Sequence, residues 1–265
     1  MLIDTNGIKL HCELTGKPDG PVVVLGHSLA SSMVMWEPQL AVLEPFFSVV
    51  RYDMRGHGGS DVTKGAYSLE MLAKDVVGLL DALDVEKAHF VGLSIGGMIG
   101  QALGLNHADR LLSLTLCDTA PVLPEEAKPL FRERMDLARE QGMGVLMEGT
   151  LTRWFTGPYL EKAPPVVNRI REQIQATPVD GFIGCGHAIL DLNYVDRLAT
   201  IDLDTLIIVG EDDPGTPVAA AEAIHAEIRG AELVVLPSAA HLCNIEQADR
   251  FNRALMDFLD RLNRD

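Results

Sequence analysis

The sequence is poor in basic residues, with 22 lysines and arginines against 38 aspartates and glutamates, and its formal net charge is −16. Nucleic acids and anionic membrane surfaces are bound by basic faces, so this balance argues against both as partners. No apolar run approaches the roughly 20 residues that cross a bilayer, and no basic segment followed by an apolar stretch opens the chain. We therefore expect a cytoplasmic protein that binds neither nucleic acid nor membrane.

Cysteine is also scarce. The four cysteines show neither close pairing nor the Cys-x-x-Cys spacing of a metal site, which favours small buried thiols in a reducing compartment. The sequence has no dinucleotide-binding fingerprint, phosphate loop or His/Cys cluster, so we expect no cofactor and no metal. The cysteines are Cys12, Cys117, Cys185 and Cys243.

Short β-branched runs alternate with helical patterns through most of the chain. Most of these runs lack apolar/polar alternation, as expected for strands buried on both faces of a parallel sheet. Residues 8–14 do alternate and are expected to form an antiparallel edge strand, whereas the apolar spacing over residues 69–83 predicts an amphipathic helix. The pattern predicts an α/β fold with a mostly parallel central sheet flanked by helices. The other predicted strands cover residues 22–25, 48–52, 88–91, 111–117, 206–209 and 233–236.

The alternation stops between residues 121 and 200, where helical patches are separated by prolines. A structureless loop of that length is implausible in a compact domain. We therefore predict a helical cap over residues 121–200, inserted into a core formed by residues 1–120 and 201–265. The predicted helical patches cover residues 125–140, 144–155, 166–176 and 182–192.

A Gly-x-Ser-x-Gly motif from Gly92 to Gly96 directly follows one predicted strand and precedes a helix. Such a turn is too tight for side chains at the two glycines, and it holds the serine hydroxyl away from the sheet. The adjoining helix N-terminus favours a developing negative charge. We predict that Ser94 is a nucleophile; the alternative is a glycine-rich turn with an incidental serine.

A serine hydroxyl is a weak nucleophile and needs an adjacent base. Among eight histidines, His241 is the best placed, because it follows the last predicted strand and precedes the final helix. The supporting acid accepts the proton of histidine Nδ1 and stabilises the imidazolium. We predict Asp213 for this role because it lies in the turn just before Pro214, with Asp212 and Asp118 as alternatives.

Attack on a carbonyl also needs two N–H groups that bind the oxyanion. We expect one from Ile95, the residue after the nucleophile, and one from Leu29, in the loop that follows an early strand. Ser28 either adds its hydroxyl to this site or turns to solvent.

Further motifs surround these residues: His27-Ser28-Leu29, Met35-Trp36-x-Pro38-Gln39, Arg51-Tyr52-Asp53-x-Arg55-Gly56-x-Gly58-x-Ser60, His107-Ala108-Asp109-Arg110, Arg153-Trp154-Phe155-Thr156 and Gly210-x-x-Asp213-x-x-Thr216-Pro217. With them, and with the order serine, aspartate, histidine, the chain resembles the α/β-hydrolase superfamily over essentially its whole length. Within that superfamily it most resembles the 3-oxoadipate enol-lactonases of bacterial aromatic-ring degradation. One departure is His27, where such lactonases often carry asparagine.

The resemblance implies a cofactor-free hydrolase that cleaves a small carboxylic ester or enol-lactone through an acyl-enzyme. An enol-lactone substrate bears a free carboxylate, for which Arg153 is the expected partner and Trp154 an apolar wall. Each also has an ordinary alternative, a solvated charge for Arg153 and packing for Trp154. Ser28 and Trp36 complete the expected substrate-binding residues, although the sequence favours core packing for Trp36.

Other activities share much of this pattern. General carboxylesterases and carbon–carbon bond hydrolases are alternatives, and a cofactor-free perhydrolase or haloperoxidase keeps the same triad but usually has little or no cap. Haloalkane dehalogenases and epoxide hydrolases are disfavoured, because they place aspartate where Ser94 stands. A ligand receptor on the same fold is the non-enzyme alternative. The expected partner is a small ester or lactone, and a homo-oligomer is left open.

Overall fold

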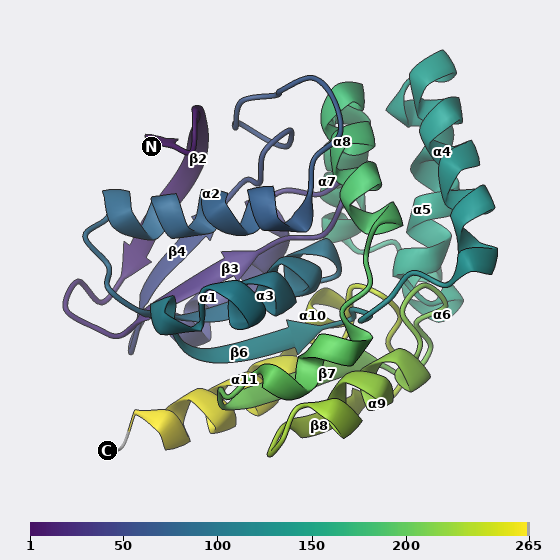
Figure 1. The fold of residues 1–265 in the computed structure, drawn as a ribbon. Coiled ribbons are helices and arrows are strands. Elements are labelled where there is room, and N and C mark those ends of the chain that lie inside the picture. The colour runs from purple at the N-terminus through teal and green to yellow at the C-terminus, as the bar shows by residue number, and fades with distance from the viewer. Residues whose placement is uncertain (264–265) are drawn as a thin grey trace.

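The structure, a computed structural model that describes residues 1–263, is built on one eight-stranded sheet (Figure 1). The strands are β1 (Leu2–Thr5), β2 (Ile8–Gly16), β3 (Val22–Gly26), β4 (Ser48–Tyr52), β5 (Ala88–Leu93), β6 (Leu111–Cys117), β7 (Thr205–Gly210) and β8 (Glu232–Leu236). They lie in the order β1-β2-β4-β3-β5-β6-β7-β8, and every neighbouring pair from β4 to β8 is parallel. The predicted α/β architecture with a mostly parallel sheet is confirmed.

The antiparallel end of the sheet differs from the prediction in one respect. β2 pairs antiparallel with β4, but it also pairs with β1, which forms the edge. Asn6 and Gly7 join β1 to β2, and their φ angles of 43° and 76° are typical of a two-residue hairpin turn. The strand expected at the edge, β2, is therefore the second strand of the sheet. The Asn-Gly pair was the feature of the sequence that could have indicated a hairpin and hence β1.

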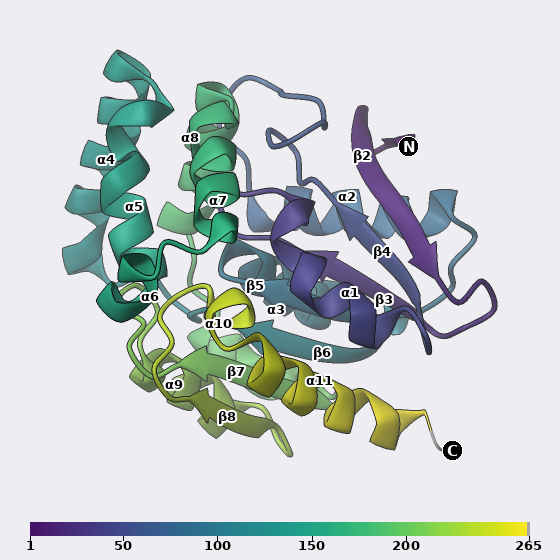
Figure 2. The ribbon, with the colours of Figure 1, turned by 180° about the vertical axis from the view of Figure 1, so that it is seen from behind.

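Helices cover both faces of the sheet, and its central strands are therefore buried along their whole length. Every residue of β5 and β7 is buried, as expected for strands between two helical layers. The apolar stripe predicted over residues 69–83 forms the buried side of a helix. One face is covered by α2 (Leu69–Ala82), α3 (Ile95–Asn106) and α9 (Val218–Glu227), and the other by α1 (Glu37–Leu43) and α11 (Ala248–Leu262) (Figures 1 and 2).

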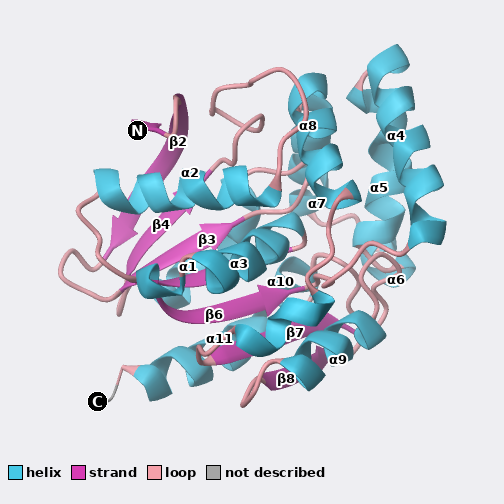
Figure 3. Ribbon diagram, viewed as in Figure 1, coloured by secondary structure: helices cyan, strands magenta, loops and turns pink. Residues whose placement is uncertain are grey.

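Residues 121–200, here called the cap segment, contain helices and loops and no strand (Figure 3). An isolated bridge between Val122 and Asn193 joins its two ends. The predicted helical patches are present, although several begin or end at other residues. Figures 1 and 2 show the helices grouped at one end of the sheet. They are α4 (Lys128–Gln141), α5 (Met147–Trp154), α6 (Gly157–Glu161), α7 (Pro165–Ala176) and α8 (Val179–Leu190). The last two residues of the predicted core, 264 and 265, lie outside the described residues.

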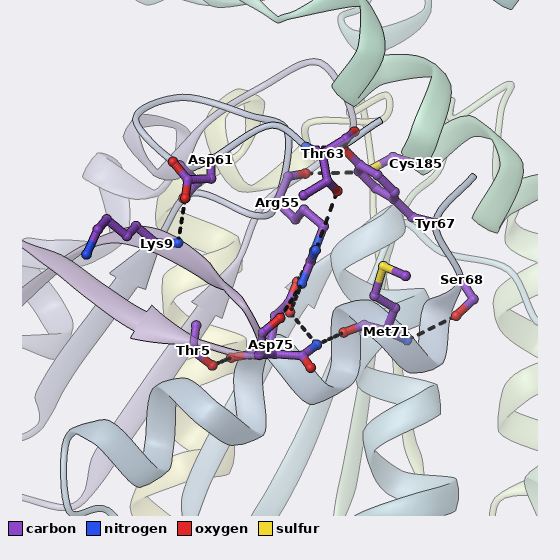
Figure 4. A network of polar contacts seen from close by, with 12 residues as sticks. Thr5, Lys9, Arg55, Asp61, Thr63, Tyr67, Ser68, Met71, Asp75 and Cys185 are labelled. Atoms are coloured by element: carbon purple, nitrogen blue, oxygen red, sulfur yellow. Dashed lines mark hydrogen bonds and ion pairs between the residues drawn. The ribbon is translucent and has the colours of Figure 1, made fainter. Parts of the chain in front are cut away.

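A buried ion pair fixes the loop of residues 53–61, which follows β4. Arg55 donates through Nε to Oδ2 of Asp75 at 2.8 Å and through Nη2 to Oδ1 at 2.6 Å (Figure 4). Both side chains are buried, and Asp75 lies on α2. Because the guanidinium meets the carboxylate with two parallel hydrogen bonds, the pair fixes orientation as well as distance. The loop is thereby tied to α2.

The loop of residues 53–61 also contacts the cap segment, at a position where only glycine fits. A Cβ atom on Gly181 of α8 would lie 1.9 Å from the carbonyl oxygen of Gly56. Farther along α8, the carbonyl of Gly184 accepts the N–H of Tyr67 at 3.1 Å. The backbones of the loop and of α8 are therefore in direct contact, which sets the position of the cap segment relative to the sheet.

All four cysteines are buried and free, as predicted. Within residues 1–263, none of the helices combines the length and the apolar character needed to cross a membrane.

Candidate active site

Ser94 occupies a strained turn between β5 and α3. Its φ and ψ angles are 61° and −119°, a conformation that non-glycine residues rarely adopt. A Cβ atom on Gly92 would lie 2.2 Å from the carbonyl oxygen of Gly96, and one on Gly96 would lie 2.3 Å from that of Gly26. The expectation that neither position accepts a side chain is therefore met. The N–H of Ser94 donates to the Cys117 carbonyl at 2.9 Å, which anchors the turn to β6.

His241 lies in the loop between β8 and α10 (Cys243–Glu246), and its Nδ1 donates to Oδ2 of Asp213 at 2.7 Å. The carboxylate of Asp213 also accepts hydrogen bonds from the N–H of Gly215 at 2.8 Å and from the Thr216 hydroxyl at 2.6 Å. With the Nδ1 proton directed at the carboxylate, Nε2 is left as the acceptor. Asp212, the neighbouring alternative, is exposed. The geometry therefore pairs His241 with Asp213.

Asp118, the other alternative acid, is buried at the end of β6. Its Oδ1 accepts the N–H of Gly210 at 2.8 Å, and it forms no hydrogen bond with His241. Burial raises the pKa of Asp118 to about 8, and the charge of Asp213 adds to the effect. Asp118 is therefore a buried neighbour of the Asp213–His241 pair and not the hydrogen-bond partner of His241.

Burial and mutual attraction oppose each other in the pKa values of this pair. Burial acts to lower the pKa of His241, but the charge and hydrogen bond of Asp213 raise it by more. Burial likewise acts to raise the pKa of Asp213, yet the charge of His241 and the hydrogen bonds on the carboxylate leave that pKa below its ordinary value. The arrangement therefore favours an imidazolium next to a carboxylate, the state that a general base reaches after it accepts a proton.

Ser94 and His241 line one cavity of about 580 Å³, within the range that holds small-molecule ligands. Their exposed fractions are 8% and 7%, so both reach the cavity from otherwise buried positions. Within residues 1–263, the Ser94 hydroxyl and the His241 Nε2 are not joined by a hydrogen bond. Such bonds are often long before substrate binds. The structure thus brings both groups to one cavity without closing the contact between them.

In the described part of the chain, the N–H groups of the two predicted oxyanion donors, Leu29 and Ile95, are unpaired, and in the case of Leu29 both flanking N–H groups are engaged. In the loop after β3, the N–H of Ser28 points to the sulfur of Met35 at 3.3 Å and that of Ala30 donates to Nε2 of His57 at 3.0 Å. Within residues 1–263, by contrast, the N–H groups of Leu29 and Ile95 have no acceptor. Leu29 lines the cavity, and Ile95 begins α3 directly after Ser94.

Two buried imidazoles hold this loop. His27 donates from Nδ1 to the Ser28 carbonyl at 2.8 Å and accepts the Met54 N–H on Nε2 at 2.9 Å. Burial lowers the pKa of both histidines, that of His57 to about 3, so each stays neutral and keeps Nε2 as an acceptor. The sequence placed His27 in this loop, but it gave no sign that His57, within a turn motif, braces Ala30.

Three of the four predicted substrate-binding residues, Ser28, Arg153 and Trp154, line the cavity. Trp36 does not, and this expectation is corrected. Its side chain is 0% exposed and packs against Phe251 of α11, with ring centroids 6.1 Å apart. The short 3-10 helix that carries Trp36 packs between the sheet and the terminal helices, so its indole belongs to the core.

A set of hydrogen bonds that the sequence did not predict joins the end of α5 to the loop that carries His241. Glu246 accepts hydrogen bonds from the N–H of Thr156 at 3.1 Å and from the N–H of Ala240 at 3.0 Å. The Trp154 carbonyl accepts the Leu242 N–H at 3.0 Å. Residues of the cap segment are therefore held directly against the loop that carries His241. The cavity is also lined by Arg134 of α4, which the sequence reasoning missed.

Comparison with known proteins agrees with this fold. The alpha/beta hydrolase fold family matches residues 21–248. A 3-oxoadipate enol-lactonase of Acinetobacter baylyi is 32% identical over 256 residues, which covers 97% of this chain and 95% of the relative. The enol-lactonase structure from Burkholderia xenovorans LB400 has a TM-score of 0.95 at 37% identity, covering 98% of this chain and 100% of that one. A malate-bound esterase from Thermogutta terrifontis has a TM-score of 0.93 at 31% identity, covering 99% of each chain. The protein therefore belongs to the alpha/beta hydrolase fold family, as a hydrolase of carboxylic ester bonds.

Proposed function

We propose that this hydrolase opens a small enol-lactone through an acyl-enzyme formed on Ser94. The observation that carries the proposal is the His241–Asp213 pair, joined at 2.7 Å, which borders the same cavity as the strained Ser94. A serine at a tight turn, a histidine with a free Nε2 and a carboxylate behind it are the parts that acyl transfer needs.

The first half of the reaction forms the acyl-enzyme. The Ser94 oxygen attacks the lactone carbonyl while Nε2 of His241 takes the hydroxyl proton, and Asp213 stabilises the resulting imidazolium. The N–H groups of Leu29 and Ile95 bind the negative oxygen of the tetrahedral intermediate. When this intermediate collapses, the ring C–O bond breaks and His241 returns the proton to the departing enol oxygen, which stays attached to the acyl group.

The second half repeats the chemistry with water. His241 takes a proton from water as its oxygen attacks the acyl carbon, and collapse releases Ser94 with its hydroxyl restored. The net change is one water consumed and one carboxylic acid formed. No step needs a cofactor, and the groups named here supply every proton transfer.

The walls of the cavity suit a small apolar ring that carries an acid. Trp154 supplies an apolar face beside His241, Arg153 is the partner proposed for the remote carboxylate, and Ser28 borders the nucleophile. In this proposal the cap segment acts as a lid domain on the core. The enzyme works in the cytoplasm. Its reaction belongs to aromatic-ring degradation through the β-ketoadipate pathway. Its proposed partner is this small substrate, without nucleic acid or membrane, and a homo-oligomer is left open.

A general carboxylesterase is the second candidate, because a cavity of about 580 Å³ leaves room for esters larger than a small lactone. The test compares kcat/KM for 3-oxoadipate enol-lactone with kcat/KM for phenyl acetate. Preference for the lactone supports the proposal, and turnover of phenyl acetate alone supports the second candidate.

The assignment of the nucleophile is tested by Ser94→Ala. In a comparable triad the loss in kcat was about 10⁶-fold, and we expect a loss of that order here, with an unchanged melting temperature or a higher one. Substantial turnover by the folded variant would refute acyl transfer through Ser94.

A further inference from the structure

β8 is the last strand of the sheet, and its outer side is open. It pairs with β7 on one side, while α9 and α11 pack against its two faces (Figure 1). Within residues 1–263, no backbone group outside β7 bonds to Leu233, Val234 or Val235. An edge strand presents a row of N–H and carbonyl groups that can pair with a further strand. β8 can therefore accept one more strand.

The side chains of β8 do not protect this edge. Strand edges are usually guarded by lysine, proline, a bulge or an inward-pointing charge. Residues 233–236 are Leu-Val-Val-Leu, and the side chain of Val235 is 40% exposed. At the other edge of the sheet, β1 has only four residues, and one of them, Asp4, is ion-paired with Lys9. The apolar edge at β8 is thus the one suited to association.

A groove of about 450 Å³ lies between this edge and α11, and it is less acidic than the rest of the protein. Three positive and two negative side chains line it, in a chain whose net charge is −16. Two copies of so acidic a protein repel each other over most of their surface, and least where the local charge is not negative. The charged residues are Glu232 of β8 and Arg250, Arg253, Asp257 and Arg261 of α11.

The charges of α11 make the helix complementary to an antiparallel copy of itself. Counted outward from Leu255, each of the three arginines of α11 has an aspartate at the mirror position. In an antiparallel pair related by a twofold axis, each residue faces the mirror residue of the other copy. Every charge on α11 then faces its opposite. The mirror pairs are Arg253 with Asp257, Arg250 with Asp260, and Asp249 with Arg261.

The central charges of this pattern are available to a second copy. Arg250, Arg253 and Asp257 are exposed, and within residues 1–263 none of the three forms an ion pair. Arg261 does pair, with Glu232 at the start of β8. Exposed ion pairs contribute little individually, but complementary charges across an interface fix its register and exclude other partners.

We propose that two copies of this chain form a dimer about a twofold axis that passes beside Val234. The two β8 strands pair antiparallel, so that Leu233 of each copy lies opposite Val235 of the other and the sheet continues across the interface. The two α11 helices lie antiparallel on one face of that sheet, with Arg253 opposite Asp257. None of the residues that line the groove also lines the active-site cavity, so the dimer is independent of the proposed activity.

Charge reversal tests the register. Sedimentation velocity of the full chain over a range of concentrations measures the dissociation constant of the dimer. Arg253→Asp brings like charges together at two symmetric places, and we expect it to weaken the dimer at least about 10-fold. Asp257→Arg should do the same, although it lowers the net negative charge and would favour any unspecific association. An equal mixture of the two variants restores every opposite-charge pair at these positions, so heterodimers should form about as tightly as the parent dimer.

Arg132→Asp is the matched control for charge, because Arg132 is exposed on α4 and lies outside the groove. It alters the net charge as Arg253→Asp does, and it should leave the dissociation constant unchanged. The apolar edge is tested by Val235→Lys, which guards the strand and should give monomers. Leu112→Lys is its control, at a 41% exposed position on β6, and should still dimerise.

Thermal melting of each variant at low concentration checks that it is folded, and the charge variants decide the question if Val235→Lys is not. A parent protein that stays monomeric up to its solubility limit would overturn the proposal. Single charge variants that dimerise as tightly as the parent, or a mixture of them that forms no heterodimer, would overturn it equally.

Discussion

The indole of Trp154 stacks on the imidazole of His241, with ring centroids 6.4 Å apart and planes inclined by 27°. A residue of the cap segment therefore covers one face of the proposed base, while Asp213 holds its Nδ1 edge. The cap segment and the loop that carries His241 are therefore in direct contact. Changes at their contacts should consequently alter catalysis as well as substrate binding.

Replacing Trp154 tests this contact. Trp154→Leu keeps an apolar wall but loses the stack, and aromatic pairs of this kind contribute about 0.5–1.5 kcal/mol. We expect kcat to fall about 2- to 10-fold, with a smaller effect in Trp154→Phe, which keeps an aromatic ring. Steady-state kinetics on p-nitrophenyl butyrate measures both. Equal losses in the two variants would show that the ring itself is unimportant.

We expect Glu246 to stabilise the contact between the cap segment and the loop that carries His241. Its carboxylate accepts the N–H groups of Thr156 and Ala240, on the cap segment and the histidine loop. Glu246→Gln keeps the shape and removes the charge, and hydrogen bonds to charged groups contribute about 1.5–3 kcal/mol. We expect a loss of that size in the free energy of urea unfolding, together with a reduced kcat. Unchanged stability would mean that water replaces these bonds at no cost.

A change at His57, which does not line the cavity, tests the role of the loop that carries Leu29. Its neutral Nε2 accepts the N–H of Ala30, directly after the proposed donor Leu29. His57→Phe leaves that N–H unsatisfied and frees the loop, so kcat should fall toward the roughly 10²–10³-fold loss seen when one oxyanion donor is removed. His57→Gln, which keeps an acceptor, should retain more of the activity. A change in KM alone, with kcat intact, would argue against this role.

The pH dependence follows from the Asp213–His241 pair. His241 must be unprotonated to accept the serine proton, and its pKa is raised above 6.5 because the charge and hydrogen bond of Asp213 outweigh the opposing effect of burial. The acid limb of kcat/KM therefore lies above pH 6.5 and activity declines as pH falls through it.

Asp213→Asn removes the charge and the charged hydrogen-bond partner that contribute most to raising the pKa of His241, and leaves burial, which lowers it. The acid limb should then move to lower pH, and kcat should drop by about 10⁴-fold, as in a comparable triad. A pH profile of the variant measures both effects. An acid limb at the parent's pH would show that another group controls the profile.

The parts of the site that could be predicted are those with a local sequence signal. Ser94 sits in a turn flanked by two glycines at a recognisable spacing, and Asp213 and His241 follow strands whose apolar runs are easily recognised. In a parallel sheet such loops meet at one edge, so the order of residues along the chain was enough to bring them together.

The residues that escaped prediction act through contacts between distant segments. Glu246 meets Thr156 from 90 positions away, and Arg134 reaches the cavity from a helix whose facing side depends on how the cap packs. Trp36 was misplaced for the same reason, because its side chain packs against Phe251 of α11 and does not line the cavity. Periodicity identifies an apolar face but not the element that covers it.

Covalent labelling tests the central claim most directly. A fluorophosphonate transfers its phosphonyl group to a serine only where a base and an oxyanion site activate that hydroxyl. Intact mass measurement with peptide mapping should show one adduct per chain, on the peptide that contains Ser94, absent in Ser94→Ala and much slower to form in His241→Ala. Labelling on another residue, or at an equal rate in His241→Ala, would contradict the account.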